Sequence, residues 1–262
     1  MSSNLATRSL AALVACTLAA PAVAWQCSAQ THNRTNALVE LYTSEGCSSC
    51  PPADRWLSTL GKPGAKGSVV PLALHVDYWD GLGLSDPFAR RGFSLRQREF
   101  AALRRASFVY TPQVLLQGKD FRAWGSGAFD EQLARINAQP ARAAIRLSAT
   151  QSRRDALSVE AQAKLTGTRE SSGLALYLAS YASRLVSRVQ GGENKGRRLT
   201  HDFVVVDLAG PFDFGPDGYV SAKRDLALLA GASLSNAGIA AFVQDRRSAE
   251  VLQALMLPAC PG

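Results

Sequence analysis

Two cysteines separated by two serines, Cys47-Ser48-Ser49-Cys50, have the residue types and spacing best suited to chemistry in this 262-residue chain. They follow an apolar run over residues 37–42 that predicts a buried strand, and they precede Pro51 and Pro52, which favour the first turn of a helix. A thiol at a helix N-terminus meets unpaired backbone N–H groups and the positive end of the helix dipole, and both favour the thiolate. The second thiol lies one turn further on, so the two can close a small disulfide ring. The spacing therefore predicts a redox-active pair.

Metal binding is the competing interpretation of a Cys-x-x-Cys pair. A zinc site needs two further ligands at matched spacing, but the chain has no second such pair and its histidines are His32, His75 and His201. Soft thiolates at Cys47 and Cys50, with His75 as a third ligand, would suit Cu(I) instead. The pair is thus expected to be a redox site that needs no cofactor, with copper binding as the alternative.

Strands and helices alternate from residue 37 to about residue 139. The first strand and helix are followed by a predicted strand over 69–76, a helix over 93–105, short strands near 114–116 and 121, and a helix over 129–138. Thr111-Pro112 precedes the third strand, where a proline suits a tight turn with a cis bond. The alternation predicts an α/β domain over residues 36–139.

The spacing of apolar residues changes after Pro140. Short runs of alternating or apolar residues are separated by turns that contain Gly, Pro or Asn, which is typical of antiparallel sheets. These runs cover residues 145–149, 157–161, 174–181, 185–189, 203–208 and 239–243. They predict a second, mainly antiparallel, sandwich-like β domain over residues 142–257.

The first half resembles the thioredoxin superfamily in its order of elements. The resemblance covers about residues 36–139 and implies that Cys47 attacks a partner, that Cys50 resolves the mixed disulfide, and that Thr111 and the cis-proline Pro112 contact the substrate. It also implies that Glu40, on the first strand, is the buried carboxylate that accepts a proton. A salt-bridged strand residue is the other interpretation of Glu40.

Two departures from the superfamily matter. Ser48-Ser49 is not the intervening dipeptide of thioredoxins, glutaredoxins or disulfide isomerases, so neither an oxidising nor a reducing direction follows from it. In this layout His75 and Asp77 follow the second strand at the same end of the sheet as the cysteines. They are candidates for proton handling, or they form a structural hydrogen-bonding cluster.

A narrower resemblance covers nearly the whole mature chain. The chain is similar to a secreted bacterial family catalogued as domain of unknown function 1223, which has no established activity. The resemblance implies a thioredoxin-like fold plus a β domain in an exported protein. The segments that carry it are residues 40–54 (ELYTSEGCSSCPPAD), 75–80 (HVDYWD), 86–88 (DPF), 96–98 (RQR), 109–113 (VYTPQ) and 192–201 (GENKGRRLTH).

In the last of these segments His201 could form a separate polar site with Glu193 and Asn194. A hairpin turn at Gly191-Gly192 would explain the glycines and the asparagine without any ligand.

Residues 1–24 have the pattern of a secretion signal. An apolar stretch follows Arg8 and ends in a small-x-small site at Ala22-Val23-Ala24, so cleavage near Ala24 and a periplasmic or secreted location are expected. A lipobox ending at Cys16 is the less favoured alternative.

Cleavage would leave four cysteines, an even number that suits a disulfide framework in an exported protein. Three pairings are possible. Since Cys47 and Cys50 can pair locally, Cys27 is left to bridge to Cys260 and tie the two ends together. The alternative is two free thiols near the chain ends.

The formal net charge of +8 comes mainly from scattered arginines without an aromatic-interleaved stripe. The nearest approach to a cluster is Arg184, Arg188, Lys195, Arg197 and Arg198, which is interpreted as solvated surface. We therefore expect neither a nucleic-acid partner nor a membrane span. The expected partners are exported thiol or disulfide proteins, with a non-catalytic interaction module braced by a permanent disulfide as a third hypothesis.

Overall fold

The computed structural model describes residues 26–61, 67–81, 83, 85–167, 170–231 and 233–258. The expected signal segment 1–24, its Cys16 and the expected bridge partner Cys260 lie outside these residues. Cys27 itself is buried on the first strand.

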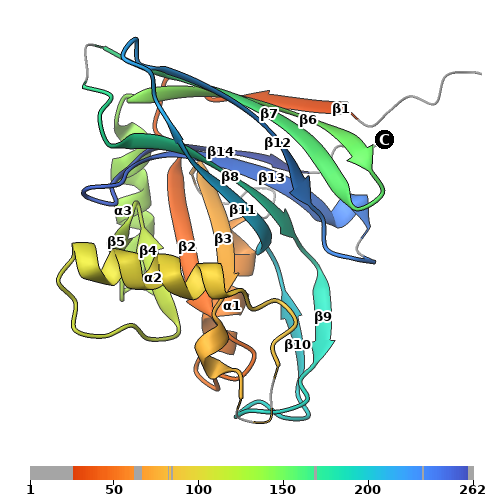
Figure 1. Cartoon of the computed structure of the whole chain (residues 1–262). Helices are drawn as coiled ribbons and strands as arrows, with labels where there is room; N and C mark the ends of the chain where they lie inside the picture. Colours follow the sequence, from red (N-terminus) through yellow and green to blue (C-terminus); the bar gives the residue numbers. More distant parts are fainter. Residues whose placement is uncertain are drawn as a thin grey trace, which may run out of the picture.

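A mixed eight-stranded sheet organises the fold (Figure 1). Its strands occur in the order β14-β13-β8-β11-β3-β2-β4-β5. Their bounds are β14 Val251–Pro258, β13 Ala237–Asp245, β8 Leu174–Ala182, β11 Val204–Asp213, β3 Val69–His75, β2 Ala37–Thr43, β4 Gln113–Leu116 and β5 Lys119–Asp120. Only β2–β3 and β11–β3 pair in parallel among these neighbours.

Strand β2 is buried along its whole length because helices cover both of its faces. Val39 and Leu41 pack with side chains of α1 (Cys50–Leu60) and α3 (Gly127–Ala138). Leu38 and Tyr42 point the other way and pack with α2 (Arg91–Leu103). The alternation of a strand thus explains why the run over 37–43 is apolar at nearly every position.

A second sheet, with four antiparallel strands, covers the other end of the molecule. Its order is β1-β6-β7-β12, with bounds β1 Gln26–Gln30, β6 Ala143–Arg153, β7 Ala156–Leu165 and β12 Tyr219–Ala227. Its inward side chains, such as Ile145 and Val159, pack against alternate residues of β8 and β13, such as Leu176 and Ile239. The two sheets form a sandwich, as the pattern after Pro140 predicts.

Strands β8 and β13 face two cores at once. The side chains of Ala179 and Phe242 point away from the sandwich and pack in the core that contains Leu38 and Tyr42 of β2. At the far edge, the side chain of Asn36 donates to the backbone of β14 at Ala254. The sequence division into residues 36–139 and 142–257 therefore crosses a continuous sheet and a shared core. The fold is mostly β, with several antiparallel pairs.

A two-stranded ribbon completes the fold. Strands β9 (Leu185–Arg188) and β10 (Arg198–His201) pair only with each other among the described strands. The ribbon extends from the sandwich toward the start of α1, where the expected chemistry lies (Figure 1). Two short 3₁₀ turns cover Asp77–Trp79 and Leu234–Asn236. No helix in the described residues is long and apolar enough to cross a membrane.

Because the two halves share a core, they should unfold together. Phe242 is fully buried and stacks on Tyr177, with ring centroids 5.1 Å apart. We expect Phe242→Ala to lower the free energy of unfolding by about 3–5 kcal/mol. The loss should be equal by far-UV circular dichroism and by the fluorescence of Trp56, Trp79 and Trp124, which all lie in the other half. Val186→Ala, at a 52% exposed site, is the control. Two separate transitions would contradict a shared core.

Candidate functional site

The two cysteines form a disulfide where β2 passes into α1. Their Cα atoms lie 5.4 Å apart, and α1 begins at Cys50. The Cys47 amide donates to the carbonyl of Ser44, and the Cys50 amide donates to that of Cys47, so the loop is tightly wound. The local pairing expected from the spacing is confirmed. Cys47 is only 2% exposed and Cys50 is fully buried.

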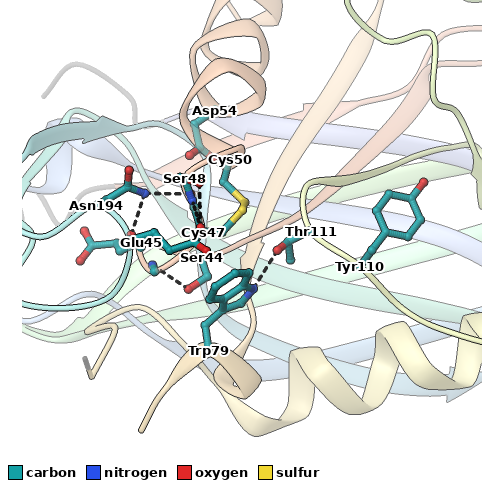
Figure 2. The surroundings of a disulfide bond; sticks show 12 residues. Ser44, Glu45, Cys47, Ser48, Cys50, Asp54, Trp79, Tyr110, Thr111 and Asn194 are labelled. Atoms are coloured by element: carbon teal, nitrogen blue, oxygen red, sulfur yellow. Dashed lines mark hydrogen bonds between the residues drawn. A yellow bond between two sulfur atoms is a disulfide. The ribbon is translucent and has the colours of Figure 1, made fainter. Parts of the chain in front are cut away.

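The β9–β10 ribbon covers this loop. At its tip, the fully buried amide of Asn194 donates to the carbonyl oxygens of Glu45 at 2.9 Å and of Cys47 at 2.8 Å (Figure 2). Arg197 in turn donates to the Asn194 side-chain oxygen at 2.7 Å. Both polar ends of the Asn194 amide are therefore satisfied, as a buried polar group requires.

Two neighbours of Asn194 add to the contact. The Glu193 carboxylate accepts from the amide of Ser48 at 2.9 Å and from its hydroxyl at 2.7 Å, and these bonds lower the pKa of Glu193. The backbone of Gly192 (φ +66°) lies so close to Gly46 that a Cβ built on it would be 2.8 Å from the Gly46 Cα. The glycine is needed both for its conformation and for this close approach.

A cluster of buried ionisable side chains lies among the segments that meet here. It contains His75 from the end of β3, His201 from β10, Glu45 from the cysteine loop, Asp54 from α1, and Asp86. The two imidazole rings meet edge to face, with centroids 5.1 Å apart. Their segments are distant in sequence, so only the folded chain brings them together.

Each histidine is paired with a carboxylate. His75 Nδ1 lies 2.8 Å from Asp86 Oδ2, and His201 Nε2 lies 3.2 Å from Glu45 Oε1. Asp86 also accepts the Glu45 amide, and Glu45 is bonded to the hydroxyl of Ser187 on β9. The far ring nitrogens, His75 Nε2 and His201 Nδ1, make no hydrogen bond, although His201 Nδ1 is 4.0 Å from Asp54 Oδ2.

Burial and pairing shift the pKa values of these side chains in different directions. Burial alone would raise the pKa of Asp86, but the charge and hydrogen bond of His75, with backbone amides, lower it from 3.8 to about 2. Burial opposes the charged form of His75, yet Asp86 outweighs it and raises the His75 pKa above its usual 6.5. For Asp54, burial dominates the attraction of His201 and His75 and raises its pKa. The fold thus favours a His75–Asp86 ion pair beside a carboxyl that resists ionisation.

The loop before β4 lies on the other side of the disulfide. The Thr111–Pro112 peptide bond is cis, as the sequence leads us to expect, and the Thr111 hydroxyl accepts from the Trp79 indole at 2.8 Å. The Tyr110 carbonyl accepts from buried Gln97 at 2.9 Å. Figure 2 shows Thr111 and Trp79 beside the sulfurs, with Asn194 on the opposite side.

Glu40 has a different environment. It is buried, but its carboxylate pairs with Arg96 of α2 at 2.7 Å, and Arg96 also donates to Gln244. These residues line a cavity of about 470 Å³ between α2 and the sheet, together with Tyr177. The salt-bridged interpretation of Glu40 is therefore the one the contacts support, and Asp54, one turn after Cys50, is the carboxyl beside the pair.

Other expected residues are placed as follows. Asp77 lies in a 3₁₀ turn and bonds to Ser94 of α2 rather than to the cysteines. His75 belongs to the buried cluster, but no three His, Cys, Asp or Glu side chains within the described residues are placed to hold a metal ion. The copper alternative thus has no ligand set assembled from Cys47, Cys50 and His75 here. The bridge from Cys27 stays a prediction because Cys260 is outside the described residues.

The comparisons with known proteins agree with the motifs. A family model described as "Protein of unknown function (DUF1223)" matches residues 38–244. The chain belongs to the DUF1223 family. That match includes the cysteine loop, the ribbon and all five members of the buried cluster. A search of curated proteins finds no match.

Two solved structures resemble this DUF1223 protein. A crystal structure of an Agrobacterium tumefaciens protein is 25% identical, with 88% of this chain and 98% of that chain covered and a TM-score of 0.63. HBP35 of Porphyromonas gingivalis is 15% identical, with 88% and 79% covered and a TM-score of 0.61. The second likeness concerns the fold alone.

The sequence does not predict that Asn194, Glu193 and His201 join the cysteines. The motif over residues 192–201 is shared with the family, but by sequence alone it fits a separate polar site or a plain turn. The family motifs also contain Glu45, Asp54 and Asp86. The sequence feature that indicates these three as candidate site residues is a carboxylate placed next to an apolar run.

The His75–Asp86 pair should control acid stability. A carboxyl whose pKa is lower in the folded protein stabilises it above the unfolded pKa, and this contribution is lost as the pH falls from about 4 to about 2. We expect Asp86→Asn to reduce the free energy of unfolding at neutral pH by about 2 kcal/mol and to flatten the acid limb. Urea titrations across this pH range measure both effects. Asp155→Asn, at an exposed carboxyl, should change neither; an unchanged acid limb in Asp86→Asn would contradict the assignment.

The ribbon should limit access to the disulfide. Gly192 and Gly196 both have positive φ, but a Cβ on Gly196 would meet nothing within 4 Å. We expect Gly192→Ala to separate the ribbon tip from Gly46 and to speed reduction by dithiothreitol about ten-fold, which corresponds to about 1.4 kcal/mol of lost docking. Gly196→Ala carries the same backbone strain and should react at the unmodified rate. Equal rates in the two variants would show that the ribbon does not shield the pair.

Proposed function

We propose that this protein is an exported, thioredoxin-like thiol–disulfide redox protein that works through Cys47 and Cys50. One observation carries the proposal: the disulfide lies at the N-terminus of α1 between the cis-Pro112 loop and a buried histidine–carboxylate cluster. The positive end of the α1 dipole favours a thiolate there. The strand–helix–strand order of β2, α1 and β3, with β4 antiparallel to β2, supports the thioredoxin-like assignment of residues 36–139. The signal pattern over residues 1–24 supports a periplasmic or secreted location.

The exchange proceeds in two displacements. A thiolate of a partner dithiol attacks Cys47 Sγ, the Cys47–Cys50 bond breaks, and Cys50 leaves as a thiolate. The partner's second thiolate then attacks its own sulfur in the mixed disulfide and releases Cys47. Two electrons pass from the partner to the pair, and the partner leaves as a disulfide. The reverse sequence oxidises a partner dithiol.

Asp54 is placed to serve the leaving sulfur of Cys50. Residues four apart on a helix share a face, and both Cys50 and Asp54 are on the buried face of α1. A carboxyl that resists ionisation can donate its proton to the Cys50 thiolate. In the reverse direction the Asp54 carboxylate accepts the proton of Cys50, which is the role that the thioredoxin resemblance implies for Glu40.

A permanent, structural disulfide is the second candidate. The observation in its favour is that Cys47 is 2% exposed and Cys50 is fully buried. In that case the pair would brace the cysteine loop, and the protein would act as a non-catalytic interaction module.

Redox titration and trapping separate the two candidates. We expect the pair to equilibrate with dithiothreitol and to have a potential within the range of about −270 to −120 mV known for exchange proteins. Cys50→Ser, expressed with its signal, should accumulate mixed disulfides that a reductant dissolves, whereas Cys47→Ser/Cys50→Ser should not. A potential below about −300 mV without trapped species would favour the structural role.

A further inference from the structure

The outer face of the β9–β10 ribbon carries unneutralised positive charge. In the antiparallel register Arg188 of β9 lies directly opposite Arg198 of β10, and the next outward pair along is Val186 opposite Thr200. Both arginines are exposed, and so is Lys195 at the tip. Like charges directly opposite one another destabilise an antiparallel pair. The ribbon therefore holds an arrangement that the fold itself does not favour.

Nothing in the described part of the chain compensates these charges. Neither Arg188 nor Arg198 has a carboxylate within ion-pair distance there, whereas exposed Lys223 and Arg246 each have one. Residues 184–198 contain five basic side chains and one acidic side chain. That acid, Glu193, is already bonded to Ser48. The positive charges of Arg188 and Arg198 are therefore available to pair with carboxylates of another molecule.

The charged ribbon contacts the loop that carries the disulfide. The ribbon tip holds the Cys47 carbonyl through Asn194, and the Arg197 guanidinium supports that amide. A groove of about 510 Å³ runs over the ribbon and is lined by Val186, Ser187, Arg188, Gly196 and Arg198. Only the loop at the ribbon tip, which contacts the Cys47 carbonyl, separates a ligand in this groove from the cysteine loop.

The ribbon also has an open strand edge. β9 and β10 pair only with each other among the described strands, and α1 lies along β10, so β9 is the outer strand (Figure 1). An unpaired edge with an apolar residue such as Val186, which is 52% exposed, suits the addition of an extended segment.

From these observations we infer that the β9–β10 ribbon docks an acidic, extended segment of the protein that exchanges electrons with Cys47 and Cys50. The inference rests on the proposed function. Carboxylates of the segment lie between Arg188 and Arg198 and relieve their repulsion, while its backbone follows the edge of β9. Such docking brings a thiol carried on the same polypeptide to Cys47 Sγ, where the two displacements described above follow.

Matched dithiol peptides test the inference. Two synthetic peptides share one Cys-x-x-Cys and differ only in flanking glutamates or lysines. We expect the acidic peptide to reduce the disulfide about ten-fold faster at about 0.05 M salt, and this preference to vanish near 0.5 M salt. Dithiothreitol, which has no charge, reports the chemistry of the pair alone. Rates are followed by quenched thiol labelling.

Variants locate the effect on the ribbon. In the double variant Arg188→Gln/Arg198→Gln, reduction of the disulfide by the acidic peptide should be about five-fold slower, and reduction by dithiothreitol should be unchanged. The control Arg146→Gln/Lys164→Gln removes the same charge from the exposed face of the four-stranded sheet and should keep the preference.

The outcomes separate the two proposals. If dithiothreitol reduces the pair but the ribbon and control variants behave alike, the docking inference is wrong and the redox function stands. If dithiothreitol cannot reduce the pair in any variant, the proposed function itself fails. If phosphatidylglycerol vesicles bind through the two arginines while the peptides show no charge preference, the ribbon is a membrane contact and the inference is overturned.

Discussion

The amide of Asn194 joins the two parts of the site. It is fully buried, and it donates to the carbonyls of Glu45 and Cys47 while accepting from Arg197. A buried amide that lost these partners would destabilise the protein by about 1–3 kcal/mol, and the carbonyl of Glu45 would lose its side-chain partner as well. The conformation of the cysteine loop therefore depends on the ribbon, and the ribbon tip depends on the loop.

The same dependence holds for the charges beneath the disulfide. Glu45 is a buried carboxylate whose partners, Ser187 and His201, both come from the ribbon. Buried charges are tolerated only when paired and hydrogen-bonded, so the ribbon must be in place for the cysteine loop to keep Glu45 inside. Asp86 connects this arrangement to His75 at the end of β3. Two polar pairs and one carboxyl are thus organised by segments from both halves of the sequence.

Much of the secondary structure follows from the sequence because its signals are local. The strand over 37–43, the helix from Cys50 and the strands after Pro140 follow from apolar spacing, prolines and turn residues. β12 is not predicted from the sequence because only one of its faces is apolar, with Val220 and Leu226, and even that face includes Arg224, while the other carries Lys223 and Asp225. β14 was missed because a short apolar run near a chain end fits a strand or a helix equally well. The sequence also does not predict that the segments before and after residues 139–142 contribute strands to the same sheet. Strand order depends on pairing between distant segments, which local patterns do not encode.

For the site, the sequence by itself determines the Cys47–Cys50 pair, its place at a strand-to-helix junction, and the cis-proline turn at Thr111-Pro112. These depend on residues within a few positions of one another, where steric and hydrogen-bonding preferences act directly. The tertiary structure alone decides that Glu40 pairs with Arg96, that Asp54 lies near His201, and that the ribbon docks on the cysteine loop. The Asn194–Cys47 bond spans 147 positions, and no local preference encodes such a contact. The pair that the sequence indicates as a redox site is, in the folded protein, a buried disulfide.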